Sequence, residues 1–203
     1  IENNIKTHLK EFNINNYPKI IAVSKTFKID KISPLIEHGH THFGENKVQE
    51  ATEKWSEIKK LNPKIQLHMV GKLQTNKVKF AVKLFDYIHS VDNEKLAKKI
   101  ADEQFKINKK VKVFLQVNIG NEDQKSGINK KELKQLASYC KEIGLNLIGL
   151  MCIPPAFVNP EVYFEEMKIL NKSFDFAELS MGMSSDYLIA AKYLSTFVRI
   201  GSG

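Results

Sequence analysis

The strongest constraint on the fold is a regular alternation of short apolar segments with longer amphipathic ones. The short segments have the Val, Ile, Leu and Phe content of β-strands, and the longer ones repeat apolar residues with helical period. The predicted strands are Lys19–Lys25, Thr41–Glu45, Gln66–Gly71, Tyr87–Val91, Val111–Asn118, Leu145–Ile153, Glu178–Met183 and Thr196–Gly201. Such alternation predicts an α/β fold, and eight strands is the count of a (β/α)8 TIM barrel. A doubly wound open sheet has the same local pattern, so periodicity leaves both architectures open.

The segments between the strands predict helices. In Asn93–Phe105, the residues Leu96, Ile100 and Phe105 are assigned to the apolar face. Asn93 is a helix-starting residue type, and Ser33-Pro34 predicts another helix start earlier in the chain. No linker, repeat or low-complexity tract interrupts the 203 residues. We therefore expect residues 1–203 to form one domain, with both termini trimmed because the chain starts without Met and stops abruptly.

Composition indicates an intracellular protein. No segment approaches the roughly 18–20 apolar residues of a membrane span, and the polar first ten residues do not resemble a signal peptide. Cys140 and Cys152 lie in apolar surroundings without a CxxC spacing. This pattern predicts two buried thiols in a reducing compartment. We expect a cytoplasmic protein with no membrane partner.

The net charge of +8 is distributed rather than concentrated. Lysines occur along every helical segment, never more than two in a row, and aromatic residues are not interleaved with them. A surface that binds nucleic acid needs clustered basic residues together with aromatic residues on which the bases stack. We therefore expect a solvated lysine-rich surface and no nucleic-acid partner. Arg199 is the single arginine among 31 basic residues, which suggests a position where a planar, permanently charged fork is needed.

Lys25 directly follows the apolar run Ile20–Val23, with only Ser24 between them. An amine beside an apolar wall loses its charge more readily than one in water. A lysine that forms a Schiff base with a carbonyl compound requires this property. Position alone also fits a lysine that has left its strand into solvent. Both interpretations stay open at this stage.

A phosphate site is predicted after the last two strands. Leu179–Ser185 follows a strand and opens the amphipathic segment Asp186–Tyr193, where Ser184 or Ser185 is expected to cap the helix. The turn Gly201-Ser202 follows the eighth strand. Barrels often bind phosphate with the loops after strands seven and eight. Ordinary helix capping explains either element by itself, and only their combination favours phosphate.

Other motifs are weaker. His38, His40 and His42 alternate and could face one metal ion, but no carboxylate or thiol lies at matching spacing. Gly71-Lys72 lacks the flanking residues of a P-loop, and the chain has neither GxGxxG nor GxSxG. We therefore expect no metal site.

Eight sequence blocks together resemble the pyridoxal phosphate homeostasis proteins. They are VSKTF at 23–27, HFGENKVQEA at 42–51, HMVGKLQTNKVK at 68–79, IHSVDNEKLA at 88–97, LQVNI with the following KSG at 115–127, GLMCIPP at 149–155, LSMGMSSDY at 179–187 and VRIGSG at 198–203. The blocks occur in family order across nearly the whole chain. One departure is Leu194, because the family usually has glycine just before the Ser-Thr pair of the last strand.

The resemblance implies a (β/α)8 barrel similar to the N-terminal domain of alanine racemase, with pyridoxal 5′-phosphate (PLP) as its cofactor. It implies that Lys25 forms the Schiff base and that Asn46 approaches the ring from the second strand. Arg199 would face the pyridine nitrogen.

The phosphate would be lined by Ser184, Gly201 and Ser202, with Ser180 nearby. An arginine beside the ring nitrogen opposes its protonation and weakens the ring as an electron sink. The resemblance therefore implies a monomeric carrier and regulator in intracellular PLP homeostasis, with no catalytic residue, whose partners are PLP and PLP-dependent apoenzymes or amino acids. The alternative is a single-domain PLP-dependent amino-acid racemase.

Overall fold

The eight strands are all parallel and close into a barrel in the order of the sequence. The computed structural model describes residues 1–122 and 126–201. The strands are β1 (Lys19–Val23), β2 (His42–Glu45), β3 (Gln66–Met69), β4 (Tyr87–Val91), β5 (Lys112–Val117), β6 (Asn146–Cys152), β7 (Glu178–Met183) and β8 (Phe197–Ile200). Pairing of β1 with β8, which places Ile21 beside Arg199, closes the sheet. The barrel prediction is therefore confirmed, and the open sheet is excluded.

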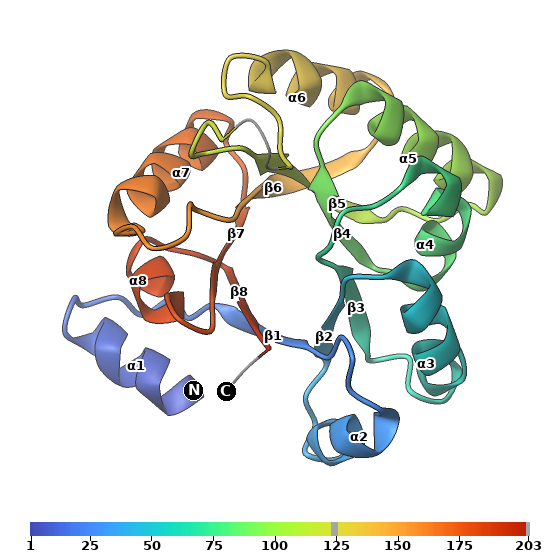
Figure 1. Ribbon diagram of the computed structural model, residues 1–203, viewed down its shortest axis with the longest axis horizontal. Coiled ribbons are helices and arrows are strands. Elements are labelled where there is room, and N and C mark those ends of the chain that lie inside the picture. Colours follow the sequence, from blue (N-terminus) through green and yellow to red (C-terminus); the bar gives the residue numbers. More distant parts are fainter. Residues whose placement is uncertain (123–125, 202–203) are drawn as a thin grey trace.

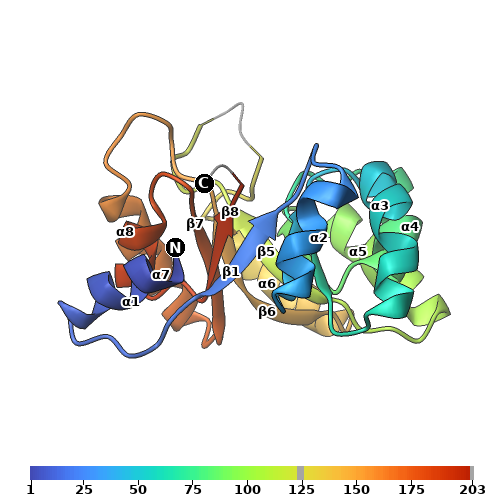
Figure 2. The ribbon, with the colours of Figure 1, turned by 90° about the horizontal axis from the view of Figure 1, so that it is seen from below.

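Helices surround the barrel on its outside (Figure 1). They are α1 (Glu2–Lys10), α2 (Ile29–Glu37), α3 (Val48–Leu61), α4 (Val78–Leu84), α5 (Glu94–Lys106), α6 (Leu133–Glu142), α7 (Glu161–Ser173) and α8 (Tyr187–Lys192), with the short 3₁₀ helix η1 (Thr75–Lys77) before α4. Figure 2 shows α2, α3 and α4 on one side of the molecule and α1, α7 and α8 on the other. The additional helix α1 packs on α8 through Ile5, Leu9 and Ala191. No helix in the described parts of the chain combines the length and apolar character that a membrane crossing needs.

One apolar layer lies on each side of the sheet. The larger one fills the space between strands and helices, with Trp55, Phe43 and Phe85 among its fully buried side chains. The smaller one fills the barrel interior and consists of Ile21, Tyr87, Phe114, Met151 and Phe197. Three histidine rings share this interior, because His68 stacks on Tyr87 at 4.1 Å and His89 on Phe114 at 4.3 Å, and His42 lies 5.8 Å from the Phe197 ring.

Two details of the predicted helices were wrong. Phe105 is 87% exposed, whereas Leu96 and Ile100 are buried. At about 100° per residue, Phe105 lies about 140° around α5 from Ile100 and faces solvent. Helix α2 begins at Ile29, so Ser33-Pro34 lies inside it instead of starting it. The predicted start at Asn93 is confirmed, because its side chain accepts a hydrogen bond from Leu96 N at 2.9 Å.

Candidate functional site

A cavity of about 750 Å³ opens at the carboxyl ends of the strands, and we call it the mouth cavity. Its lining includes Lys25 after β1, Asn46 after β2, Ser184 after β7, Arg199 in β8 and Gly201 after β8. The barrel thus brings together five predicted site residues that are up to 176 positions apart in the chain (201 minus 25). Ser180 is not part of the lining, and Ser202 lies outside the described residues.

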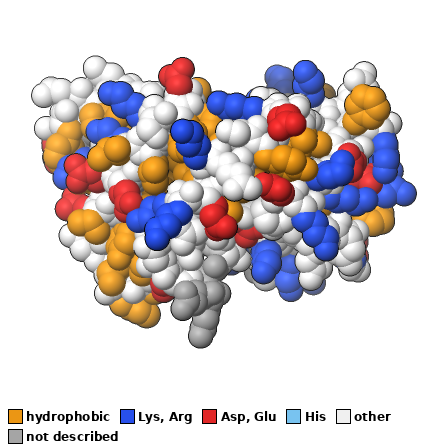
Figure 3. Space-filling view, turned by 90° about the horizontal axis from the view of Figure 1, so that it is seen from above, with side chains coloured by type: hydrophobic (Ala, Val, Ile, Leu, Met, Phe, Trp, Pro, Cys, Tyr) orange, Lys and Arg blue, Asp and Glu red, His pale blue; other side chains and the backbone are white. Residues whose placement is uncertain are grey.

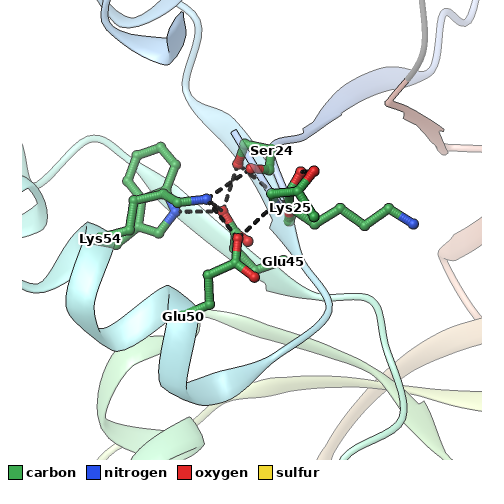
Figure 4. A network of polar contacts seen from close by, with 8 residues as sticks. Ser24, Lys25, Glu45, Glu50 and Lys54 are labelled. Atoms are coloured by element: carbon green, nitrogen blue, oxygen red, sulfur yellow. Dashed lines mark hydrogen bonds and ion pairs between the residues drawn. The ribbon is translucent and has the colours of Figure 1, made fainter. Parts of the chain in front are cut away.

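Lys25 is exposed at the rim of the mouth cavity. Strand β1 ends at Val23, two residues before it, so the apolar run does not enclose the side chain as the sequence suggested. Within the part of the chain that the structure describes, no hydrogen bond or ion pair occupies the Lys25 ammonium. In Figure 4 the side chain extends away from the neighbouring polar network. The amine is therefore free to meet a ligand in the cavity.

The backbone around Lys25 is held by a buried carboxylate, Glu45 (Figure 4). Glu45 Oε1 accepts hydrogen bonds from Ser24 Oγ at 2.8 Å, Lys54 Nζ at 2.9 Å and Trp55 Nε1 at 2.8 Å. Ser24 is the residue immediately before Lys25, so this contact sets the direction in which β1 leaves the barrel. Hydrogen bonds from charged donors to a buried carboxylate are among the stronger ones in proteins.

The residue after Lys25 is held by the same network. Thr26 N donates to Glu50 Oε1 at 2.6 Å, and Lys54 Nζ donates to Glu50 Oε1 at 3.2 Å and to Ser24 O at 2.8 Å. Thr26 has φ +66°, in the left-handed region that β-branched residues rarely adopt. Contacts on both sides of Lys25 maintain this turn and leave its side chain outside the network.

Sequence reasoning did not identify these supporting residues. Glu50, Lys54 and Trp55 belong to α3, and their polar groups point back towards the end of β1. A signal was present, because Glu45 is an acidic residue directly after Phe43-Gly44 within a predicted strand. Such a residue usually needs partners when it is buried.

Arg199 lies at the floor of the mouth cavity and is only 5% exposed. Its Nη1 donates to Ser180 Oγ at 2.7 Å and its Nη2 donates to Cys152 O at 2.8 Å. Burial lowers the pKa of the guanidinium, but an arginine keeps its charge in proteins. Ser180, which the resemblance placed near the phosphate, is fully buried and accepts this hydrogen bond from Arg199.

The ends of β7 and β8 meet through Ser184 and Gly201. Gly201 N donates to Ser184 Oγ at 3.2 Å. The prediction that Ser184 or Ser185 caps the following helix was wrong, because α8 starts after Asp186 and has only six residues. Asp186 Oδ1 accepts from Met183 N at 2.6 Å and so closes the turn. The two loops do lie together at the mouth cavity, as the combined prediction required.

Asn46, which lines the mouth cavity, has an unsatisfied side-chain acceptor. Its Oδ1 is buried and has no hydrogen-bond partner among the described residues. A methyl group on neighbouring Gly71 would lie 2.5 Å from Asn46 O, so only glycine allows the two backbones to approach this closely. A buried acceptor without a partner is uncommon in folded proteins and is often satisfied by a ligand.

The electrostatic character of the mouth cavity favours an anion. Lys25 and Arg199 supply positive charge, and none of the described lining residues is acidic. An amine in such a cavity can condense with a carbonyl group. For metal ions, no cluster of three or more His, Cys, Asp or Glu side chains is found among the described residues. His42, one of the three alternating histidines, instead hydrogen-bonds to His68.

The fold and the site define a barrel of the alanine racemase N-terminal domain class. The family model for "Alanine racemase, N-terminal domain" matches residues 1–203. An alanine racemase of Clostridium difficile shares this fold with a TM-score of 0.69 at 14% identity, covering 98% of the chain and 55% of the racemase.

Closer similarities are found to proteins that the chain covers over most of their own length. The pyridoxal phosphate homeostasis protein of Aquifex aeolicus is 37% identical over 92% of the chain and 86% of its own length, and that of Haemophilus influenzae is 36% identical over 100% and 90%. PipY of Synechococcus elongatus, solved with PLP bound, has a TM-score of 0.81 at 31% identity over 97% of both chains. The chain belongs to the pyridoxal phosphate homeostasis protein family.

Proposed function

We propose that the protein binds PLP in the mouth cavity as a Schiff base with Lys25 and serves as a carrier and regulator in PLP homeostasis. The observation that supports this most directly is the free Lys25 amine on a cavity that also contains a buried arginine. The names of the relatives and the PLP-bound structure of PipY point in the same direction.

The residues present fit the chemistry of the cofactor. When bound, PLP supplies an aldehyde that condenses with a lysine amine and an aromatic ring that withdraws electrons. Lys25 is the amine, and the unsatisfied Asn46 Oδ1 offers an acceptor at the same cavity. We assign the phosphate to the loops of Ser184 and Gly201 together with Ser202, because serine hydroxyl groups can donate hydrogen bonds to an anion.

Arg199 determines what the bound cofactor can do. We assign its guanidinium to the pyridine nitrogen, where a fixed positive charge disfavours ring protonation. A neutral ring withdraws electrons less strongly, so it stabilises a carbanion less well. Ser180 and the Cys152 carbonyl keep the guanidinium in place from below.

A carrier is favoured over an amino-acid racemase. Racemisation needs a second proton donor opposite the lysine. Among the described residues that line the mouth cavity, none is a carboxylate, a histidine or a tyrosine. The amine can hold the aldehyde and release it, which is what a carrier requires.

The proposal also covers the location, the oligomeric state and the partners of the protein. We place the protein in the cytoplasm as a monomer that passes PLP to apoenzymes or exchanges it with amino acids, without nucleic-acid partners. Both cysteines are free and buried, and burial raises the pKa of each thiol to about 12, so neither is poised for disulfide chemistry. Lysines on the face drawn in Figure 3 are interspersed with acidic and apolar side chains and do not form one basic stripe.

The proposal is tested by loading the purified protein with PLP and reducing it with borohydride. We expect a yellow protein whose absorbance disappears on reduction, with the label on Lys25 in the peptide map. Lys25→Ala should abolish the colour. The matched control is Lys28→Ala, which removes an exposed lysine outside the cavity lining and should bind normally. A colourless wild-type protein would contradict cofactor binding, and sustained racemisation of L-alanine would contradict the carrier role.

A further inference from the structure

Three histidines form a continuous hydrogen-bonded chain through the barrel interior. His42 Nδ1 lies 2.9 Å from His68 Nε2, and His68 Nδ1 lies 2.9 Å from His89 Nε2. His89 Nδ1 lies 3.0 Å from Ser180 Oγ, which accepts the hydrogen bond from Arg199. The chain crosses strands β2, β3, β4, β7 and β8, and its last member lines the mouth cavity.

The three imidazoles are neutral. His68 and His89 are fully buried, and burial holds the pKa of each well below its usual value. The charge of Arg199 lowers the pKa of His89 further. Burial, followed by the charge of Lys19, lowers the pKa of His42 to about 4. A neutral imidazole has one N–H donor and one acceptor nitrogen, so each ring can extend the chain by one link.

Arg199 sets the direction of every link. Because a guanidinium can only donate, it uses a lone pair of Ser180 Oγ. Among the described residues the buried Ser180 hydroxyl has hydrogen-bond contacts only with Arg199 and His89, and of these only His89 offers an acceptor, so the Ser180 hydrogen points to His89 Nδ1. The proton of His89 is then on Nε2, and this N–H group donates a hydrogen bond to His68 Nδ1.

The same rule continues to the other end of the barrel. The proton of His68 is on Nε2, and this N–H group donates a hydrogen bond to His42 Nδ1. The proton of His42 is therefore on Nε2 as well. His42 lines a second cavity of about 590 Å³ at the amino ends of β1 and β2. The chain therefore spans the barrel from this cavity to the mouth cavity. A hydrogen-bonded chain of uniform direction is strengthened because its members polarise one another.

We propose that His89, His68 and His42 are positioning residues for Arg199, acting through Ser180 as one chain of Nε2–H tautomers. Apolar rings of similar size would fill the same volume, as Tyr87, Phe114 and Phe197 do beside them. The histidines add direction, because they hold the acceptor face of Ser180 towards the guanidinium. The importance of Arg199 for the cofactor rests on the proposed function, whereas the chain itself is a property of the protein without ligand.

The first test reads the tautomers by ¹⁵N NMR of histidine-labelled protein without PLP. We expect His42, His68 and His89 all in the Nε2–H form near pH 7.5. In Arg199→Met the fixed donor is lost, and His89 and His68 should then populate both tautomers. Arg199→Lys keeps a charged donor and should restore the single form. Nδ1–H tautomers in the wild type, or unchanged tautomers in Arg199→Met, would overturn the proposal.

The second test observes Arg199 directly, since it is the only arginine and ¹⁵N-arginine labelling yields one side-chain spin system. In His89→Phe and His68→Phe we expect guanidinium hydrogen exchange to become about tenfold faster, as loss of one supporting hydrogen bond allows. His40→Phe is the matched control, because His40 bonds to the His42 carbonyl and not to the chain of rings. Equal exchange rates in all three variants would reject a positioning role. Neither test involves PLP, so both can be interpreted even if the Schiff-base experiment fails. If His89→Phe does not fold, the tautomers of the wild type and the exchange rate in His68→Phe test the positioning role.

Discussion

Glu45 stabilises the segment that presents Lys25, although it does not line the mouth cavity itself. Its buried carboxylate accepts from Ser24, Lys54 and Trp55. Lys54 is itself mostly buried, with 9% of its side chain exposed, so the ion pair is shielded from water. Removal of one member of a buried ion pair is far more harmful than removal of a surface pair, because the other charge stays behind without compensation.

We predict that Glu45→Gln lowers the free energy of unfolding by about 3 kcal/mol. It should also slow borohydride trapping of PLP on Lys25, since the turn around Ser24 and Thr26 loses its anchor. Urea denaturation measures the first effect and peptide mapping the second. Glu57→Gln is the control, because Glu57 pairs with Lys60 on the surface and should change stability by less than about 1 kcal/mol. Equal stability of the two variants would refute the structural role of Glu45.

Leu194 has φ +65°, a conformation that costs a residue with a side chain roughly 1–2 kcal/mol. It is also the position at which the family resemblance led us to expect glycine. The side chain is 43% exposed, so little packing is lost on its removal. We predict that Leu194→Gly raises the free energy of unfolding by about 1 kcal/mol. Leu194→Ala keeps the strained backbone and should not stabilise the protein. A lower free energy of unfolding for the glycine variant than for the alanine variant would contradict this explanation.

At the scale of elements, the backbone of β7 leaves no room for a side chain on β6 at Gly149. A methyl group there would lie 1.9 Å from the Glu178 carbonyl oxygen, which belongs to the backbone of β7 and cannot rotate away. We predict that Gly149→Ala destabilises the protein by about 3 kcal/mol, as overpacking of a sheet does. Gly144→Ala adds a methyl group to open space at φ +74° and should cost only about 1 kcal/mol. Thermal unfolding of both variants measures the difference, and equal losses would show that the contact is relieved cheaply.

The elements also show where local pattern predicts structure and where it does not. Strand and helix order followed from periodicity because each side of a barrel strand and each inner helix face is buried. Two local patterns misled the prediction. Phe105 lies on the solvent side of α5. Ser33-Pro34 follows Ile29 and Ile32, and the packing of these two residues against the core makes α2 start earlier. Tertiary packing of apolar residues thus outweighed the local start signal.

At the scale of the whole molecule, the buried histidines make stability depend on pH. Their pKa values are lowered in the folded protein, for His42 from 6.5 to about 4, so the unfolded chain binds more protons between about pH 4 and 6.5. Stability is therefore fully present above pH 6.5 and is lost as the pH falls towards the folded values. Each histidine contributes a slope of up to about 1.4 kcal/mol per pH unit.

We predict that the free energy of unfolding decreases steeply from pH 7 to pH 5, a window in which most carboxylates stay ionised. Urea titrations at several pH values measure the slope. His89→Phe should reduce it by about one proton. His38→Asn, which alters an exposed histidine, should leave it unchanged. A flat profile between pH 5 and 7 would be incompatible with three buried neutral imidazoles.

The sequence by itself determined the alternation of strands and helices, the position of Lys25 after the first strand and the loops that follow the last two strands. These are local properties: periodicity, residue type and order. Periodicity left the choice between barrel and open sheet open; the family resemblance implied the barrel, and the pairing of β1 with β8, which no local segment encodes, confirms it.

Only the tertiary structure decided which residues support the site. Glu45, Lys54 and Trp55 brace Lys25, and His42, His68 and His89 lead to Arg199, through contacts between residues from different elements. Ser180 shows the reason most clearly. The resemblance placed Ser180 near the phosphate, and only the structure shows that its hydroxyl contacts Arg199 and His89 inside the closed barrel. The direction in which a strand residue faces depends on register and closure as well as on its own sequence.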